Sequence, residues 1–200
     1  MAWSIEAALA SKMVDRVIVS TDSEDIASVA QLYGAETPFI RPAELATDDT
    51  LISPVCVHAI ETLGLADDII AISFANNPMI SGDDIDGFIE LLQSRPEANS
   101  VCMVADQDIR MARLFTRKPD GLLEHFTTGP HPERKQDCPD IYSRLDGLVV
   151  ARAKALLADR STFLPPPVLG YTAPEGEYCD DIHSPFDLDY TEWLLSRRTK

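Results

Sequence analysis

Apolar positions along the first hundred residues follow two spacings in turn, and this pattern predicts alternating helices and strands. Apolar side chains recur at helical spacing in three segments, at 2–12, 54–63 and 83–93. Three short apolar or β-branched runs are typical of strands buried on both faces, at 16–20, 68–74 and 99–105. Ser23 stands where a helix N-cap belongs, and that helix is expected to end at Gly34. Strands that alternate with helices in this way predict an α/β fold with three layers and a mostly parallel sheet.

The pattern changes after residue 106, where apolar periodicity fades and glycine, proline, histidine and charged residues cluster. This composition predicts a hairpin insertion at 107–145 rather than a second independent domain. Apolar periodicity returns with a strand at 147–150, and a last helix is expected to begin near Ser184. Residues 1–200 are therefore expected to form a single domain that contains the insertion.

Charge and composition restrict the partners that such a domain could have. Seventeen Lys and Arg residues against thirty-three Asp and Glu residues give a net charge of −16. A surface this acidic repels phosphate backbones and anionic lipid, which argues against nucleic-acid or membrane-surface binding. The four cysteines form no CxxC pair, and no apolar run approaches the roughly 18 residues of a membrane span. The N-terminus carries no export signal, so a cytoplasmic location is expected.

Polar residues follow the predicted strands at the end where open α/β sheets bind ligands. Asp22 follows the first strand, and Asn76 and Asn77 follow the second. Arg41 lies in a compact polar loop, and Asp181 ends a later apparent strand. Carboxylates at such a strand end suit Mg²⁺, which takes one or two of them besides phosphate and water. Helix capping and turn formation explain the same residue types, so a structural role for each stays open.

Basic residues concentrate inside the insertion, next to other polar side chains. Arg134 has the chemistry to hold a carboxylate, and Gln136 and Tyr142 have the chemistry to bind hydroxyl groups. Asp146 follows them and precedes a glycine. These residues indicate either a substrate-binding segment or a charged hairpin tip.

Short motifs in a fixed order run through nearly the whole chain: Ala2–Leu9, Arg16–Asp22, Tyr33–Ala35, Pro38–Pro42, His58–Glu61, Gln136–Asp137, Asp146–Gly147 and Asp181–Ile182. In this order they resemble the acylneuraminate cytidylyltransferases, which make CMP-activated sugar acids. The resemblance implies a nucleotide-diphospho-sugar transferase-like fold. It also implies transfer of CMP from CTP to a sialic-acid-like sugar acid, with release of pyrophosphate and assistance from Mg²⁺.

The same resemblance implies roles for the candidate residues, although it assigns no catalytic residue. The nucleotide is expected near four residues, Asp22, Arg41, Asn76 and Asn77. The sugar acid is expected near four others, Arg134, Gln136, Tyr142 and Asp146. Mg²⁺ is expected at Asp181 and His183. The insertion is expected to pack against a second subunit, which implies a homodimer.

Departures from the family pattern leave two interpretations open. The chain begins within the helix that follows the family's phosphate-binding loop, and His183 stands where the family usually has an aspartate. Ile52 replaces a small hydroxyl residue, and the turn at 74–78 lacks the usual glutamine. One interpretation is an enzyme whose sequence here lacks its true start. The other is a truncated or degenerate, non-catalytic member that binds a sugar acid or pairs with an active subunit.

Overall fold

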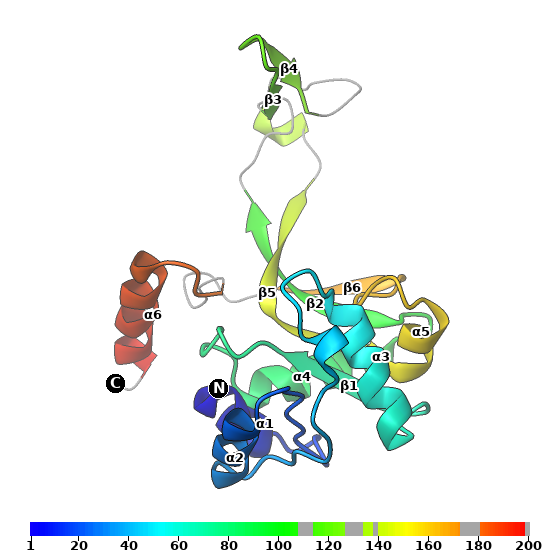
Figure 1. Cartoon of the computed structure of the whole chain (residues 1–200). Coiled ribbons are helices and arrows are strands. Elements are labelled where there is room, and N and C mark those ends of the chain that lie inside the picture. Colours follow the sequence, from blue (N-terminus) through cyan, green and yellow to red (C-terminus); the bar gives the residue numbers. More distant parts are fainter. Residues whose placement is uncertain (108–113, 127–133, 138–139, 173–180, 199–200) are drawn as a thin grey trace.

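The structure is a computed structural model, and it describes residues 1–107, 114–126, 134–137, 140–172 and 181–198. An α/β body carries an arm that projects from it, and a C-terminal helix lies beside the body (Figure 1). The body contains the helices α1 (Ala2–Ala10), α2 (Glu24–Leu32), α3 (Ile52–Leu63), α4 (Gly82–Ser94) and α5 (Ala153–Ala158). A short 3-10 turn also lies in the body, at Ala43–Leu45.

One sheet of four strands organises the body, in the order β1 (Ile69–Ser73), β5 (Ile141–Arg152), β2 (Ser100–Gln107) and β6 (Val168–Thr172). β5 runs antiparallel to both of its neighbours, whereas β2 and β6 are parallel. It follows that β1, β2 and β6 run in the same direction. The predicted α/β class with a mostly parallel sheet is confirmed, and β5 is the reversed strand within it.

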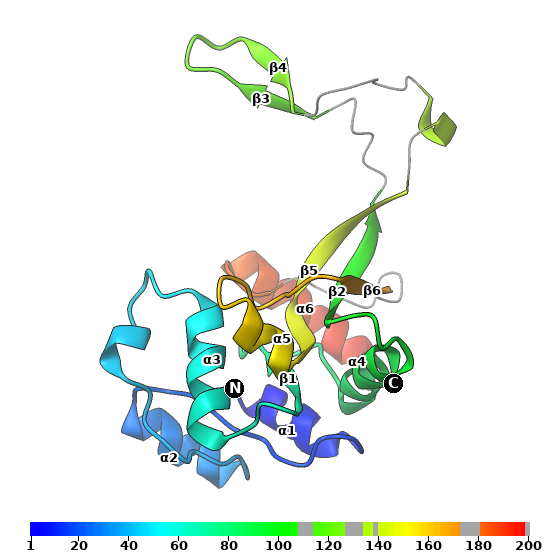
Figure 2. The same ribbon diagram turned by 90° about the vertical axis from the view of Figure 1, so that its right-hand side faces the viewer.

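Helices cover both faces of the sheet, which gives the three layers (Figure 2). On one face, α4 packs Ile85, Phe88 and Leu92 against Val101 of β2 and Leu148 of β5. On the other face, a second cluster joins α3 and α5 to β1 and β5; its members are Ile60, Leu156, Ala151, Ala153, Ile70 and Ile72. Side chains of β1 and β5 therefore point alternately into two cores, as expected for strands buried on both faces.

The prediction that residues 16–20 form a strand of the sheet is wrong. Only a single parallel bridge joins Ile18 to Glu36. The Val19 N–H donates to the Glu36 carbonyl (2.9 Å), and the Glu36 N–H donates to the Val17 carbonyl (2.7 Å). A β-branched run becomes a strand only where a neighbouring strand extends the ladder, and among the described residues this run has one partner residue.

The helix predicted after Ser23 begins and ends where the sequence indicates. The Ser23 hydroxyl accepts a hydrogen bond from the Ile26 N–H, which caps α2. The chain leaves α2 through Gly34, whose φ of 92° lies in the left-handed region that favours glycine. Local chemistry alone therefore accounts for both ends of this helix.

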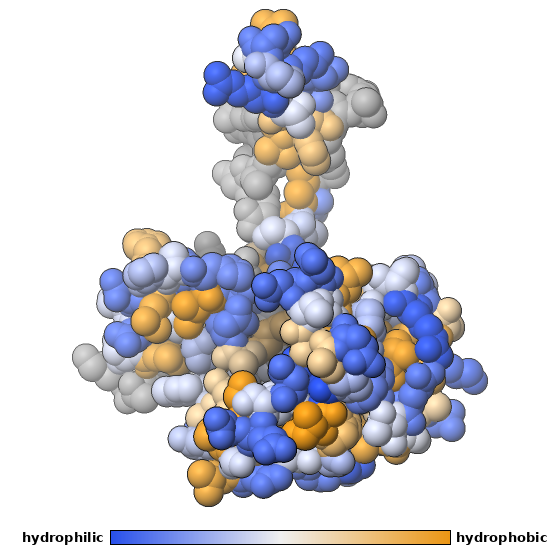
Figure 3. Space-filling view, viewed as in Figure 1, coloured by the Kyte–Doolittle hydropathy of each residue, from blue (hydrophilic) through white to orange (hydrophobic). Residues whose placement is uncertain are grey.

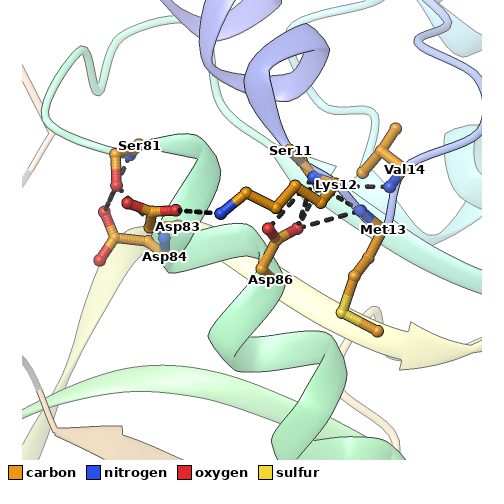
Figure 4. Close-up of polar contacts among 8 residues, drawn as sticks. All are labelled: Ser11, Lys12, Met13, Val14, Ser81, Asp83, Asp84 and Asp86. Carbon is orange, nitrogen blue, oxygen red and sulfur yellow. Dashed lines mark hydrogen bonds and ion pairs between the residues drawn. The ribbon is translucent and has the colours of Figure 1, made fainter.

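A buried carboxylate fastens the turn after α1 to α4 (Figure 4). Asp86 accepts hydrogen bonds from the Ser11 hydroxyl (2.5 Å) and from the Lys12 and Met13 N–H groups (3.1 and 3.2 Å). These bonds, the one from Ser11 foremost, hold the pKa of Asp86 below its ordinary value. Gly82 allows the close approach of the two helices, because a Cβ there would lie 2.7 Å from the Ser11 nitrogen.

The described residues of the arm are paired through their backbones and are mostly exposed. The lower halves of β2 and β5 belong to the sheet, and their upper halves form a two-stranded stem (Figure 1). Beyond the stem lie a small hairpin, β3 (Phe115–Arg117) and β4 (Leu123–His125), and a 3-10 turn at Lys135–Asp137. Every residue of β3 and β4 is exposed. These strands fall within the predicted insertion at 107–145.

The last helix, α6 (Pro185–Arg198), starts one residue after the position expected from the sequence. Leu194 and Leu195 pack on Met79 of the body. Within the described part of the chain, no helix has both the length and the apolar character needed to cross a lipid bilayer.

Candidate functional site

The turn after β1 is held in shape by Asn77. Its side chain is 2% exposed, and its amide nitrogen donates to the Asp146 carbonyl (2.7 Å). Its amide oxygen accepts a hydrogen bond from the Met79 N–H (3.1 Å). Gly147, with a φ of 148°, makes this possible, because a Cβ there would lie 2.5 Å from the Asn77 amide nitrogen. The nitrogen and the oxygen of the Asn77 amide are therefore both hydrogen-bonded to the backbone. A ligand that bound to the Asn77 side chain would compete with these hydrogen bonds.

Asn76, the neighbouring residue, faces a segment more than one hundred residues away in sequence. Its amide nitrogen donates to the Asp181 carboxylate (3.0 Å), and its carbonyl accepts from the Ile182 N–H (3.0 Å). The Nε2 atom of His183 lies 2.9 Å from the same carboxylate oxygen of Asp181. Three residues predicted from separate motifs, Asn76, Asp181 and His183, thus meet at the carboxyl end of β1. We call this group the Asp181 cluster.

Asp187 is not available to a ligand of this cluster, because its carboxylate accepts hydrogen bonds from the protein backbone. One oxygen accepts from the His183 N–H (3.1 Å), the Ser184 N–H (2.7 Å) and the Ser184 hydroxyl (2.8 Å). The Ser184 hydroxyl and the His183 N–H hold the pKa of Asp187 below its ordinary value. Asp187 therefore caps the first turn of α6 and fixes the backbone of His183.

The donors of the Asp181 cluster fit Mg²⁺ in part. The Asp181 side chain is 15% exposed, so its carboxylate is held in place yet reachable. One such carboxylate is enough for a Mg²⁺ ion that takes its other ligands from phosphate and water. The imidazole of His183 is 73% exposed and is a softer ligand than Mg²⁺ prefers. Among the described residues no group of three or more His, Cys, Asp or Glu side chains is arranged to hold a metal ion. The metal assignment stays a prediction.

A second group of polar residues joins Asp22 to Arg41. Their charged atoms lie 3.5 Å apart, and the Arg41 N–H donates to the Thr21 carbonyl (2.8 Å). The Arg41 side chain is largely buried, and in the described residues its Nε atom has no hydrogen-bond partner. The buried Ser20 hydroxyl is likewise without one there. Two predicted nucleotide-binding residues thus lie together beside buried polar atoms with unused hydrogen-bonding capacity.

The predicted sugar-acid residues divide between the base and the far end of the arm. Asp146 lies at the base, where its backbone meets Asn77. Tyr142 is exposed on the stem formed by β2 and β5. Arg134 directly precedes the 3-10 turn at Lys135–Asp137, and it makes two hydrogen bonds to Asp137 (2.7 and 3.0 Å). The 3-10 turn at Lys135–Asp137, which contains Gln136 and follows Arg134, lies on the arm beyond the stem and away from the body (Figures 1 and 2).

Arg144 is a basic residue near the site that the sequence analysis does not single out. Its guanidinium pairs with the Asp146 carboxylate (2.8 Å) and lies over the ring of Phe163, 5.4 Å from the ring centre. The sequence could have predicted that Arg144 lies next to Asp146, because residues two apart on a strand share a face. Arg144 and Asp146 obey that rule once β5 is known to begin at Ile141.

Comparison with known proteins gives a consistent family. The family model described as cytidylyltransferase matches residues 1–118. The chain is 26% identical over 198 residues to a pseudaminic acid cytidylyltransferase of Campylobacter jejuni subsp. jejuni serotype O:2, covering 97% of this chain and 84% of that protein. It is 27% identical over 206 residues to a CMP-N,N'-diacetyllegionaminic acid synthase of Legionella pneumophila, covering 98% and 84%.

Among solved structures, one similar fold is that of a CMP:2-keto-3-deoxy-manno-octonic acid synthetase complexed with CTP. The TM-score is 0.69 at 15% sequence identity, over 98% of this chain and 87% of that one. At this sequence identity the similarity to the solved structure shows the fold alone. The match to the family model covers more than half of the sequence and shows the family. The chain belongs to the cytidylyltransferase family.

Proposed function

We propose that this chain transfers CMP from CTP to a sialic-acid-like sugar acid and releases pyrophosphate. Family membership supports cytidylyl transfer, and the relatives named for pseudaminic and legionaminic acid support a sugar acid as acceptor. The contact between Asn76 and Asp181 is the observation that carries the proposal. It brings a reachable carboxylate to the carboxyl end of β1, the end at which open α/β sheets bind ligands.

In this reaction a hydroxyl oxygen of the sugar acid forms a bond to the α-phosphorus of CTP. The bond from that phosphorus to the bridging oxygen breaks, and pyrophosphate leaves. The protein contributes positioning and neutralisation of charge, with little covalent chemistry of its own. Arg41, which pairs with Asp22, is the basic residue proposed to face the nucleotide, and Asn76 is proposed to face it as well. Asp181 would hold Mg²⁺, which when bound supplies positive charge to phosphates that a chain of net charge −16 otherwise repels.

We also propose that the enzyme is a homodimer in which the arm of each copy packs on the other. Exposed apolar side chains on the arm support this, Leu122, Leu123 and Phe126 each being more than 60% exposed. Arg134 and Gln136 are then proposed to reach the sugar-acid site of the second copy, because the 3-10 turn at Lys135–Asp137 lies beyond the stem, away from the body of its own chain. A CTP-dependent enzyme also fits the cytoplasmic location expected from the sequence.

The proposal is tested by incubating the purified chain with CTP, Mg²⁺ and a panel of sugar acids. Sialic, legionaminic, pseudaminic and 3-deoxy-octulosonic acids form the panel, and the CMP-sugar product and pyrophosphate are measured. Formation of a CMP-sugar with one of these acids would establish the activity. A folded chain that binds a sugar acid without forming product would favour the non-catalytic alternative.

Asp181→Asn is the variant that tests the metal assignment. It keeps the size of the side chain and removes the charge that Mg²⁺ needs, so we expect Mg²⁺-dependent CTP binding in calorimetric titrations to weaken at least tenfold, about 1.4 kcal/mol. Asp189→Asn is the matched control, because Asp189 is an exposed acidic residue of α6 outside the Asp181 cluster. Equal loss in both variants, or no loss in either, would show that Asp181 is not the metal ligand.

A further inference from the structure

The last helix, α6, contacts the body through one of its sides. Thr191 and Leu194 are buried on that side (1% and 5% exposed), and Leu194 and Leu195 pack on Met79. A surface helix normally turns polar and charged side chains toward water on its remaining sides. On α6 a row of aromatic side chains lies there instead, so this helix has a second apolar side that the described part of the body does not cover.

This row, which we call the α6 stripe, consists of Phe186, Tyr190, Trp193 and Arg197. The three aromatic side chains are 75%, 36% and 50% exposed, in that order. The rings of Phe186 and Tyr190 are stacked with their centres 6.5 Å apart, and those of Tyr190 and Trp193 with their centres 5.9 Å apart. The Arg197 guanidinium lies over the Trp193 ring, 4.7 Å from its centre. Exposed apolar residues in mutual contact mark an interaction surface, whereas single ones need no explanation.

The spacing of the α6 stripe indicates that its partner is a helix. The four residues follow one another at intervals of four, three and four, which is the alternation of positions d and a in a heptad repeat. Side chains at these positions form the narrow seam along which two helices pack. An α-helix with a matching seam is therefore the partner that covers all three rings at once.

A second copy of α6 supplies a matching seam. The intervals of four, three and four are the same from either end, so the α6 stripe matches its own copy in the antiparallel direction. In that pair Tyr190 of one copy faces Trp193 of the other. Phe186 faces Arg197, an arrangement that suits a cation over an aromatic ring. Each contact occurs twice, as in any interface between two copies related by a two-fold axis.

The charges of α6 favour the same antiparallel arrangement. Asp187, Asp189 and Glu192 lie in the amino-terminal part of the helix, Arg197 lies in its last turn, and no acidic residue of α6 follows Glu192. An antiparallel pair brings Arg197 of one copy beside Asp187 and Asp189 of the other, whereas a parallel pair sets acid against acid. Acidic residues beside the stripe, in a chain of net charge −16, also argue against nucleic acid as the partner of these rings.

We propose that the α6 stripes of two copies of this chain pair in the antiparallel direction, about a two-fold axis between positions 191 and 192. The exposed parts of the six rings add up to roughly 500–800 Å², because a fully buried aromatic side chain covers about 150–250 Å². Most specific interfaces bury more than about 1,000 Å², so this pair is a weak contact by itself. The pairing requires neither the chemistry proposed for Asp181 nor the contact proposed for the arm.

Sedimentation equilibrium of the full chain tests the pairing, with Phe126→Ser as the background so that the proposed arm contact is weakened. We expect Trp193→Ser in this background to raise the dissociation constant of the pair about tenfold or more. Leu188→Ser is the matched control, because Leu188 is a 47% exposed residue of α6 outside the stripe, and it should leave the constant unchanged. A background chain that stays monomeric at about 1 mM would overturn the proposal and leave the stripe to a different partner. Equal constants with and without Trp193→Ser would overturn it too.

Reversal of charge tests the antiparallel direction. Arg197→Glu places an acid beside Asp187 and Asp189 of the second copy, so we expect the dissociation constant to rise about fivefold or more, since symmetry makes the change count twice. Addition of Asp189→Arg to the same chain restores an opposite charge across the pair and should recover most of this loss. Circular dichroism checks that both variants keep their helices. No recovery in the double variant would overturn the antiparallel pair, because only that arrangement brings positions 189 and 197 of different copies together.

Discussion

The two halves of β5 lie in different surroundings, although they belong to one strand. From Gly147 to Ala151 every residue is buried between the helices of the body. From Ile141 to Asp146 every residue is at least partly exposed, and the backbone pairs with β2. The body half is stabilised by packing on two faces, whereas in the arm half Leu145 packs on the core under α4 and the residues farther out rely on pairing with β2. The comparison teaches that backbone pairing shapes the arm, while its stability depends on what covers it.

Exposed apolar side chains occur on the arm and on the body alike (Figure 3). On the body they include Trp3, Leu32 and Leu51, and on the arm they include Leu122 and Phe126. The arm also contains Arg134 and Gln136, which the family resemblance connects with the sugar acid. A region that is poorly packed by itself and carries predicted binding residues is well suited to assembly with a second copy.

Truncation of a core side chain in the body should have the largest effect on stability. Phe88 is fully buried in α4 and packs on Tyr171 with ring centres 4.6 Å apart. We expect Phe88→Ala to lower the free energy of unfolding by about 3–5 kcal/mol, through lost burial and the cavity left behind. The change in the free energy of unfolding is measured by urea denaturation. A loss below about 1 kcal/mol would mean that the body is not the self-sufficient part of the molecule.

Truncation of an arm side chain should instead act on assembly. Phe126 is 66% exposed, so we expect Phe126→Ser to change the unfolding of the monomer by less than about 0.5 kcal/mol. If the arm packs on a second copy, the same change should raise the dimer dissociation constant about tenfold or more. Sedimentation equilibrium measures that constant. An unchanged constant, with Phe126→Leu as the apolar control, would remove the arm from the interface.

Acid should weaken the body through Asp86. The pKa of this carboxyl is held below its ordinary value by the Ser11 hydroxyl and by backbone N–H groups. Its folded-state pKa is therefore lower than its unfolded value of about 3.9, so its contribution is complete above that pH and is lost as pH falls through the folded-state pKa. We expect Asp86→Asn to lower Tm at neutral pH and to match the unsubstituted protein at low pH. A constant difference in Tm at all pH values would contradict this.

The smallest effect is expected for an ion pair on the arm. Lys118, which follows β3, pairs with Glu124 of β4 at 3.1 Å, and both side chains are about half exposed. An exposed pair of this kind contributes at most about 1 kcal/mol and is screened by salt. Lys118→Met should therefore change the free energy of unfolding by less than about 0.5 kcal/mol at physiological salt. A larger loss would indicate that the hairpin is part of the cooperative fold.

Local sequence predicted the parts of this fold that local chemistry determines. Ser23 and Gly34 mark the two ends of α2 because a cap and a left-handed residue act through their immediate neighbours. The run at 16–20 was interpreted wrongly, since the neighbours of a strand decide whether it joins a sheet. The reversed direction of β5 also has no local signal, because it depends on how the chain returns from the arm.

The candidate site was predictable only as separate pieces. Each member of the Asp181 cluster could be named from its motif, yet the contact between Asn76 and Asp181 joins segments 105 residues apart. The role of Asn77 was not visible, because it depends on the close approach of Gly147 from another strand. Arg134 and Gln136 could be named but not located, since nothing in their neighbourhood fixes the length of the arm.

The contact of Asp86 with the turn after α1 also has a consequence for proteolysis. Trypsin cleaves after lysine, and the peptide bond that follows Lys12 lies between two N–H groups held by this carboxylate. A protease must bind such a bond in an extended form, which the closed turn cannot supply. Cleavage at Lys12 must therefore wait for α1 to detach from α4, so its rate reports how often the amino-terminal helix opens.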